Sequence, residues 1–220
     1  MKGAQVREAG AFRDHRFFIA LVAINLVLGR IAMRFYGEQF TYFHDAISDL
    51  GATLTRGGSP NPTSPYVFAV QLVGSALVMA GLARHLRVRG LPLGSADVRL
   101  AQLAAVGFVL MPAPHNEPLY HTIHMLGAGL VVFSLWVLAM RYLLECRRLG
   151  MVHGFRVGMA GLQGTVLPYA AMFALGSEYR HVAQLLTVAA LSAILIASTS
   201  TVAREANRRA EELSGITVRG

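Results

Sequence analysis

The sequence predicts an all-α membrane protein with six transmembrane helices, one short interfacial helix and both termini in the cytoplasm. Three observations predict this fold class. Hydrophobic residues make up 54% of the 220 residues and charged residues only 15%, whereas about 25% of an ordinary soluble domain is charged. The hydrophobic residues form long blocks, as membrane-spanning helices require. The arginines lie at the ends of those blocks, which is where membrane proteins place them.

Six blocks are predicted to cross the membrane, because a helix rises 1.5 Å per residue and the hydrocarbon core is roughly 30 Å thick. They are Phe17–Phe35, Pro65–Arg84, Arg99–Ala113, Leu119–Leu144, Phe155–Leu175 and His181–Ala203. Pro112 and Pro114 end the third block early, so a tilted or re-entrant segment is an alternative there. We expect one transmembrane domain over residues 1–203 and a charged cytoplasmic tail over 204–220.

The N-terminus is positively charged like the start of a signal peptide, but no small-x-small cleavage site follows Phe17–Leu28. We therefore interpret this block as a retained first span. Cys146 is the single cysteine, which excludes an internal disulfide and a cysteine-based zinc cluster.

Basic residues give all six blocks one consistent orientation. They gather before the first block, around the second and fourth connections and after the last block, at Lys2, Arg7, Arg13, Arg16, Arg84, Arg87, Arg89, Arg99, Arg141, Arg147, Arg148, Arg156, Arg204, Arg208, Arg209 and Arg219. The first, third and fifth connections carry little beyond Arg56 and Arg180. The positive-inside rule then places both termini in the cytoplasm and the chain in the cell inner (plasma) membrane. The net charge of +8 is interpreted as topology and contact with anionic lipid, with no nucleic-acid partner.

The first outer connection contains the stretch from Phe40 to Gly51, which predicts the interfacial helix. At about 100° per residue, four polar residues fall on one side of such a helix and the hydrophobic residues on the other. The polar residues are His44, Asp45, Ser48 and Asp49. Asp45, Ser48 and Asp49 are candidate catalytic residues, with His44 as a base one turn before Ser48. The alternative is a structural polar network that holds this helix to the spans.

The third outer connection is rich in histidine. His115 and Glu117 lie in a very short loop, and His121 and His124 lie in the first turns of the next helix, three residues apart and therefore on one face. His121 and His124 could bind zinc together with His181, Asp45 or Asp49, and a hydrolase could use such a metal to activate water. The alternative is that these histidines cap the helix and bind loop carbonyls.

Several further polar residues are predicted to contact these clusters. Arg30 lies in the outer half of the first block and would either pair with Asp49 or Asp45 or hold a lipid phosphate. Glu178 and His181, at the start of the last block, could join the outer cluster as ligand-binding residues. The alternative is that they form a solvated helix start.

Polar and small residues elsewhere are interpreted structurally. The mid-span residues Asn25, Gln71 and Gln163 predict interhelical hydrogen bonds, and Gly127 and Gly129 would let another helix approach close to His124. The histidines near the arginines, at His15, His85 and His153, are interpreted as solvated surface or lipid headgroup contacts.

Two motifs together resemble a known family. They are Ile47-Ser-Asp-Leu-Gly51 in the first outer loop and His124-Met-Leu-Gly-Ala128 in the fourth block. The chain resembles, roughly from Phe17 to Ala203, a bacterial integral-membrane family of unknown function that is itself similar to the eukaryotic DRAM and FGF-receptor-activating-protein group. The resemblance implies a six-helix membrane protein, and the eukaryotic group implies lipid or lipid-anchor handling.

Three functions follow from these interpretations. The first is a membrane protein whose outward-facing His/Asp pocket binds a lipid headgroup or a membrane partner, which could include a second copy of the chain. The second is a metal-dependent membrane hydrolase that acts on lipid. The third is a proton-coupled transporter, which the sequence supports least because the ionisable groups gather at one membrane face.

Overall fold

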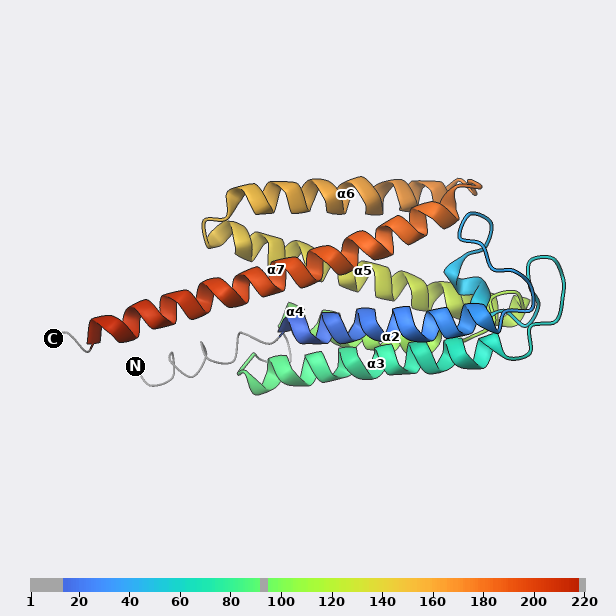
Figure 1. The fold of residues 1–220 in the computed structure, drawn as a ribbon, viewed down its shortest axis with the longest axis horizontal. Coiled ribbons are helices and arrows are strands. Elements are labelled where there is room, and N and C mark those ends of the chain that lie inside the picture. Colours follow the sequence, from blue (N-terminus) through green and yellow to red (C-terminus); the bar gives the residue numbers. More distant parts are fainter. Residues whose placement is uncertain (1–13, 92–94, 218–220) are drawn as a thin grey trace.

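The computed structural model describes residues 14–91 and 95–217. The elements in these residues are all helical, which confirms the all-α prediction (Figure 1). They are α2 (Asp14–Arg34), the 3-10 helix η2 (Ile47–Gly51), α3 (Ser64–Val88), α4 (Ala96–Leu110), α5 (Pro118–Arg148), α6 (Val152–Ala174) and α7 (Arg180–Thr217).

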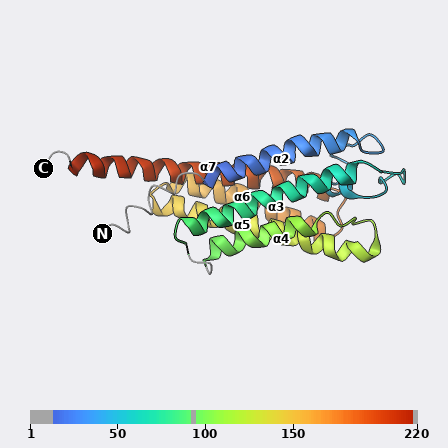
Figure 2. The same ribbon diagram turned by 90° about the horizontal axis from the view of Figure 1, so that it is seen from below.

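The helices run roughly along one common axis, and α2, α3, α4 and α5 each pack against the next (Figure 1). Helix α7 crosses this group and contacts α2, α5 and α6, while α6 packs only on α5 and α7 (Figure 2). The segments 35–63 and 111–117 lie together at one end, which we call the loop end. The α3–α4 and α5–α6 connections lie at the opposite end, which we call the basic end after its arginines.

Four helices in the described residues are long and apolar enough to cross a membrane. They are α2, α3, α5 and the part of α7 from Arg180 to Arg209. Helix α4 has 15 residues and therefore spans only about 22 Å, because Leu110 ends it before Pro112. Helix α6 is longer, but it contains four glycines, Gln163 and Pro168 and is not one of these four. Four such helices indicate a membrane protein. This finding does not include α4 or α6 among the helices that could cross the membrane.

Helices α3, α5 and α6 end with the same backbone motif. Gly90, Gly150 and Gly176 follow α3, α5 and α6 with φ of 86°, 90° and 66°. In each case the next amide donates back to a carbonyl in the last turn, as in Leu91 to Leu86 at 3.2 Å. This is the Schellman motif, which needs a left-handed residue that glycine adopts without strain.

The predicted interfacial α-helix is wrong in its extent, because the structure has only the five-residue η2 there. The two carboxylates expected on the helix surface bind loop amides instead. Asp45 Oδ2 accepts from the Thr41 amide at 2.7 Å, and Asp49 Oδ2 accepts from the Ala46 amide at 2.7 Å. Aspartate side chains that bind nearby amides compete in this way with the regular helix ladder.

Helices α2 and α3 are joined by a polar network in the middle of the bundle. Asn25 donates to the Ser75 hydroxyl at 2.9 Å, and Gln71 donates to Asn25 Oδ1 at 2.8 Å. Gln163 of α6 donates to Met140 Sδ of α5 at 3.5 Å. These contacts confirm the prediction that the mid-span amides form interhelical hydrogen bonds.

Helix α7 continues without a break through the predicted domain boundary at residue 203. Its C-terminal part extends past the other helices at the basic end (Figure 1). Glu205 pairs there with Arg208 at 2.7 Å and with Arg209 at 2.9 Å, within one turn of the same helix. The tail is thus the end of a transmembrane-length helix. Lys2, Arg7, Arg13 and Arg219, which contributed to the predicted orientation, lie outside the described residues.

Candidate functional site

The loop end is held together by an ion pair between two loops. Asp49 projects from η2, and its Oδ1 lies 3.0 Å from Nε2 of His115 in the loop before α5. The same two loops meet again where the Asn116 amide donates to Thr53 Oγ1 at 2.8 Å and its oxygen accepts from the Thr53 amide at 3.1 Å. The histidine-rich connection and the acidic connection therefore meet, as the sequence predicted.

Asp49 is a carboxylate held in its charged form. Burial raises the pKa of Asp49, but the hydrogen bond from His115, the Ala46 amide and the nearby positive charge of His181 act in the opposite direction. Together they leave the pKa of Asp49 below its ordinary value. At neutral pH this side chain is an anion and a hydrogen-bond acceptor.

His124 is buried, with only 3% of its surface exposed. Its Nδ1 lies 2.7 Å from the Met111 carbonyl oxygen and 3.1 Å from that of Ala113. Carbonyls only accept hydrogen bonds, so Nδ1 carries a proton and donates to the end of α4. The ring is also 5.2 Å, centroid to centroid, from that of His115. His124 thus binds loop carbonyls, which was the structural alternative.

His124 can reach these carbonyls because α4 and α5 approach closely just beside it. A Cβ added at Gly107 would lie 2.7 Å from the Gly127 carbonyl oxygen, and one added at Gly127 would lie 2.8 Å from the Gly107 oxygen. The prediction that Gly127 and Gly129 admit another helix is confirmed for Gly127 and wrong for Gly129. Gly129, by contrast, faces open space.

His121 does not share the environment of His124. It is exposed, and its Nδ1 lies 3.0 Å from the His115 carbonyl oxygen. No three His, Cys, Asp or Glu side chains in the described part of the chain are grouped as a metal site would need. His121, His124 and His181 are therefore not brought together as three ligands of the kind zinc requires.

The candidate nucleophile Ser48 and its candidate base His44 are not joined either. His44 is exposed, and its carbonyl oxygen accepts from the Arg56 guanidinium. Asp45 is occupied by the Thr41 amide at 2.7 Å. Within the described residues no hydrogen bond joins His44 to Ser48. Asp45, Ser48 and Asp49 lie in one loop, but only Asp49 contacts a histidine side chain.

The remaining predicted residues fall at the edge of the loop end. Arg30 is exposed, and Asp49 pairs with His115 and not with Arg30, which corrects our preferred pairing. Glu178 is exposed and His181 is half-buried. Gln184, one turn after His181 on α7, accepts from the Ile47 amide at 3.3 Å. Helix α7 thus reaches η2 through Gln184, a residue to which we had assigned no role.

A second polar cluster lies at the basic end and was missed. Asp14 begins α2, and its side chain is 7% exposed. One guanidinium nitrogen of Arg89 lies 2.8 Å from each of its oxygens, and the Tyr142 hydroxyl donates to Oδ2 at 3.1 Å. His85 Nε2 lies 3.3 Å from Oδ1. His85 is therefore part of a buried cluster, which corrects its interpretation as solvated surface.

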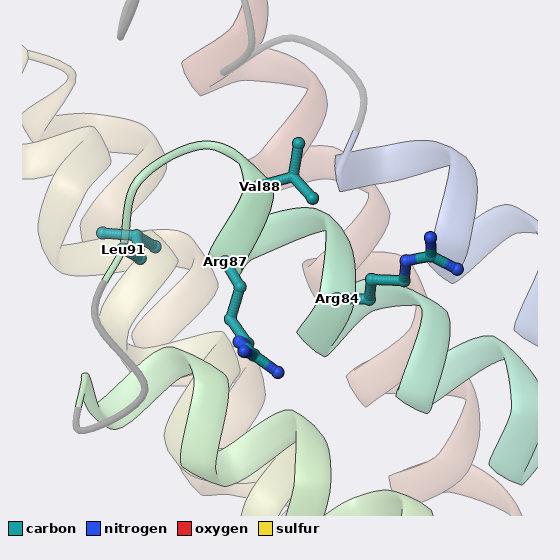
Figure 3. A pocket seen from close by; sticks show the side chains of 4 residues that line it. All are labelled: Arg84, Arg87, Val88 and Leu91. Carbon is teal, nitrogen blue, oxygen red and sulfur yellow. The ribbon is translucent and has the colours of Figure 1, made fainter.

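Both cavities of note also lie at the basic end. One, of about 640 Å³, lies between α2 and α3 and is lined by Arg16, His85 and the mostly apolar residues Phe17, Ala20, Ile24, Gly74, Leu77 and Val78. The other, of about 610 Å³, is lined by Arg84, Arg87, Val88 and Leu91 (Figure 3). Both of these cavities thus lie opposite the end at which we expected a binding pocket.

No family model, curated protein or solved structure matches this chain. Any function has to be argued from the two ends of the bundle. At the loop end Asp49, His115 and His124 bind partners within the chain, while the buried His115 Nδ1 and Asn61 Oδ1 have no hydrogen-bond partner among the described residues. The basic end offers cavities with cationic side chains at their edges.

One sequence signal could have indicated the basic end. Asp14 is a single carboxylate between Arg13 and Arg16 at the start of a hydrophobic block. A carboxylate in that position is costly unless it pairs with a cation. We interpreted the N-terminal stretch only by its positive charge, and this interpretation gave Asp14 no partner.

Proposed function

We propose that this chain is a multi-pass membrane protein that binds an anionic lipid at its basic end, in the groove between α2 and α3. One observation carries the proposal. The groove is an elongated cavity of about 640 Å³ with Arg16 and His85 among its lining residues and with apolar side chains forming the rest. A phosphate and an acyl chain need this combination of a cationic site and an apolar wall.

The charge of Arg16 supports a phosphate ligand. Among the residues that the structure describes, no carboxylate lies within ion-pair distance of Arg16. Arg89, only a few residues after His85, is by contrast neutralised by Asp14 at 2.8 Å. An arginine at a membrane boundary is stabilised by an anionic partner, and lipid phosphate is the most abundant one there.

The apolar wall supports the acyl chain. Ile24 and Leu77 line the groove deeper along the two helices than Arg16 does. Gly74 adds no side chain to the groove at that level, where a Cβ would be in ordinary van der Waals contact with Ile24 at 3.4 Å. A lipid tail lying along this path would run parallel to the helices, as it does in a bilayer.

The membrane arrangement that we propose has six crossings, with α4 and α6 completing the set. Helix α4 packs between α3 and α5 and returns the chain from the basic end to the loop end, and α6 does the same beside α7. The arginines then place the basic end, and with it both termini, on the cytoplasmic side of the cell inner membrane.

This proposal moves the lipid site away from the outer His/Asp cluster. Asp49 is an anion beside His115, and an anion repels a phosphate. The relationship to the DRAM-like family stays a proposal as well, and it is compatible with lipid handling.

The two enzymatic and transport alternatives have weaker support. A metal-dependent hydrolase needs a ligand set, and His121 and His124 face different surroundings at the loop end. One observation supports a proton-coupled transporter, because Asp14 and His85 are ionisable groups at the basic end. The polar residues between the two ends include the amides of Asn25 and Gln71 and the hydroxyl of Ser75, and amides do not carry protons as carboxylates and histidines do.

The test is lipid retention by the purified protein. Native mass spectrometry would compare bound dioleoyl phosphatidylglycerol with bound dioleoyl phosphatidylcholine, added in equal amounts. We expect the wild-type protein to prefer the anionic lipid and Arg16→Gln to lose about fivefold of that preference, since one cation near an anionic surface contributes about 1 kcal/mol. Arg99→Gln is the matched control, because Arg99 is exposed and lines neither cavity.

A second variant tests the groove itself. Ala20 lines the cavity and is half-exposed, so Ala20→Phe fills the path of the acyl chain without changing charge. We expect it to reduce retention of both lipids. Equal retention of the two lipids by the wild-type protein would overturn the proposed function.

A further inference from the structure

The second basic cavity lies on the same helix as the first. Arg84, Arg87 and Val88 of α3 and Leu91 just after it line a cavity of about 610 Å³ (Figure 3). His85, which lines the first cavity, follows Arg84 directly in the chain. The second cavity therefore lies where α3 ends, and the first begins beside it at His85 and extends along α3 to Gly74.

The helix geometry places the two cavities on neighbouring faces of α3. Successive residues of a helix are rotated by about 100°, so the face with Gly74, Val78 and His85 differs from the face with Arg84, Arg87 and Val88. Leu77 and Arg84 are two turns apart and lie nearly in line. Arg84 thus stands at the boundary between the two cavities.

The cations around the two cavities have no internal counter-ion. Arg89 pairs with Asp14, Arg141 with Asp97 and Arg148 with Glu145. In the described ranges 14–91 and 95–217, no ion pair is formed by Arg16, Arg84 or Arg87. The unpaired arginines of α3 and the start of α2 are the ones that line cavities, and Arg84 and Arg87 extend away from each other around the helix (Figure 3).

We propose that the lipid held at the basic end carries two phosphate groups, as diphosphatidylglycerol does, and straddles the end of α3. One phosphate lies at Arg16 beside His85, and the other lies in the cavity whose edges Arg84 and Arg87 form. This inference rests on the proposed function, and it adds the class of lipid. One phosphodiester carries a single negative charge and would leave the second cavity uncompensated, whereas two phosphodiesters supply an anion to each.

The separation of the two cavities also discriminates between lipids with two phosphates. A headgroup that carries both phosphates on one ring would place them together in a single cavity. In diphosphatidylglycerol a glycerol joins two phosphatidyl units, each with its own phosphate and acyl chains. Each cavity has apolar lining residues of its own, Leu77 and Val78 in one and Val88 and Leu91 in the other, so each can accommodate chain as well as phosphate.

Competition between lipids tests the inference. The full-length protein would be incubated with equimolar tetraoleoyl diphosphatidylglycerol and dioleoyl phosphatidylglycerol, and native mass spectrometry would give the ratio of bound species. We expect the wild-type protein to prefer the lipid with two phosphates. Arg84→Gln with Arg87→Gln should reduce this preference by about fivefold for each arginine removed, while retention of phosphatidylglycerol changes less than twofold.

Two controls separate the failure of this inference from the failure of the proposed function. Arg16→Gln should reduce retention of both lipids, and Arg99→Gln with Arg156→Gln removes two exposed cations outside the cavities and should change neither. No preference between the two anionic lipids, or a preference that survives loss of Arg84 and Arg87, overturns the inference alone. If neither anionic lipid binds better than phosphatidylcholine, the proposed function fails with it.

Discussion

Oδ1 of Asp49 lies 3.0 Å from Nε2 of His115, and this contact joins the loop before α3 to the loop before α5. A hydrogen bond to a charged group contributes about 1.5–3 kcal/mol, and this pair is partly exposed. We therefore expect His115→Gln to lower the free energy of unfolding by about 1 kcal/mol. Unfolding in mixed micelles, followed by circular dichroism, measures it. Glu178→Gln, at an exposed site, is the control, and an equal effect of the two changes would contradict the assignment.

The lowered pKa of Asp49 predicts the direction of a pH effect at the loop end. The unfolded chain has the ordinary aspartate pKa of about 3.9, so it binds more protons than the folded chain as the pH falls through this range. The stabilisation is complete above the ordinary value and is lost as the pH drops through the lowered one. Amide exchange of residues 41–53 should therefore accelerate below about pH 4. Asp49→Asn should remove this dependence, and an unchanged pH profile in that variant would be the contrary result.

The close approach of α4 and α5 predicts different outcomes for two nearby glycines. Gly127→Ala puts a methyl group 2.8 Å from the Gly107 carbonyl oxygen, and such overpacking costs about 1–3 kcal/mol. Gly129→Ala faces open space and should be neutral or stabilising by up to about 1 kcal/mol. The apparent midpoint of thermal unfolding in detergent compares the two. Equal midpoints would mean that the helices do not pack as described.

Much of the bundle could be predicted from the sequence, because hydrophobic length and helix punctuation are local properties. The hydrogen bond between Asn25 and Gln71 was predicted because an amide side chain in the middle of a span needs a hydrogen-bond partner. The sequence predicted that the acidic and the histidine-rich connections meet at the loop end. It did not predict which residues pair there. Asp45 and Asp49 were assigned to a helix face, whereas their carboxylates bind the amides of Thr41 and Ala46.

The basic end could not be predicted in the same way. Whether an arginine is paired depends on which helix lies beside it, and the sequence does not give that. Arg89 pairs with Asp14 across two helices, while Arg84 and Arg87 on the same helix line a cavity. All three look alike in the sequence, as basic residues at the end of a span.

Loss of the Asp14 carboxylate should be among the most damaging single changes at the basic end. It is 7% exposed and is bound by Arg89 at 2.8 Å and by Tyr142 at 3.1 Å. Asp14→Asn leaves a partly buried arginine without its anion, which costs about 3 kcal/mol. Asp14→Asn with Arg89→Met should recover part of this loss. Asp97→Asn, at the more exposed pair with Arg141, should cost less than about 1 kcal/mol, measured in the same micelles.

The single buried cysteine makes the proposed orientation testable. In a Cys146→Ser background, Pro62→Cys places a thiol at the loop end and Asn207→Cys places one at the basic end, both at exposed positions. A membrane-impermeant maleimide added to intact cells should label the first and not the second. Labelling of the second alone would reverse the orientation, and labelling of neither would mean that the loop end is covered.

Helix α7 is one continuous helix that reaches from the loop end to the basic end of the molecule. Its first turns reach η2 through Gln184, and its other end carries the paired charges of Glu205 and Arg208 beyond the neighbouring helices. Neither proline nor glycine interrupts it between Arg180 and Arg209, so it has no built-in hinge. A small tilt imposed where the loops sit is therefore amplified at the distant tip, as it is along any stiff lever.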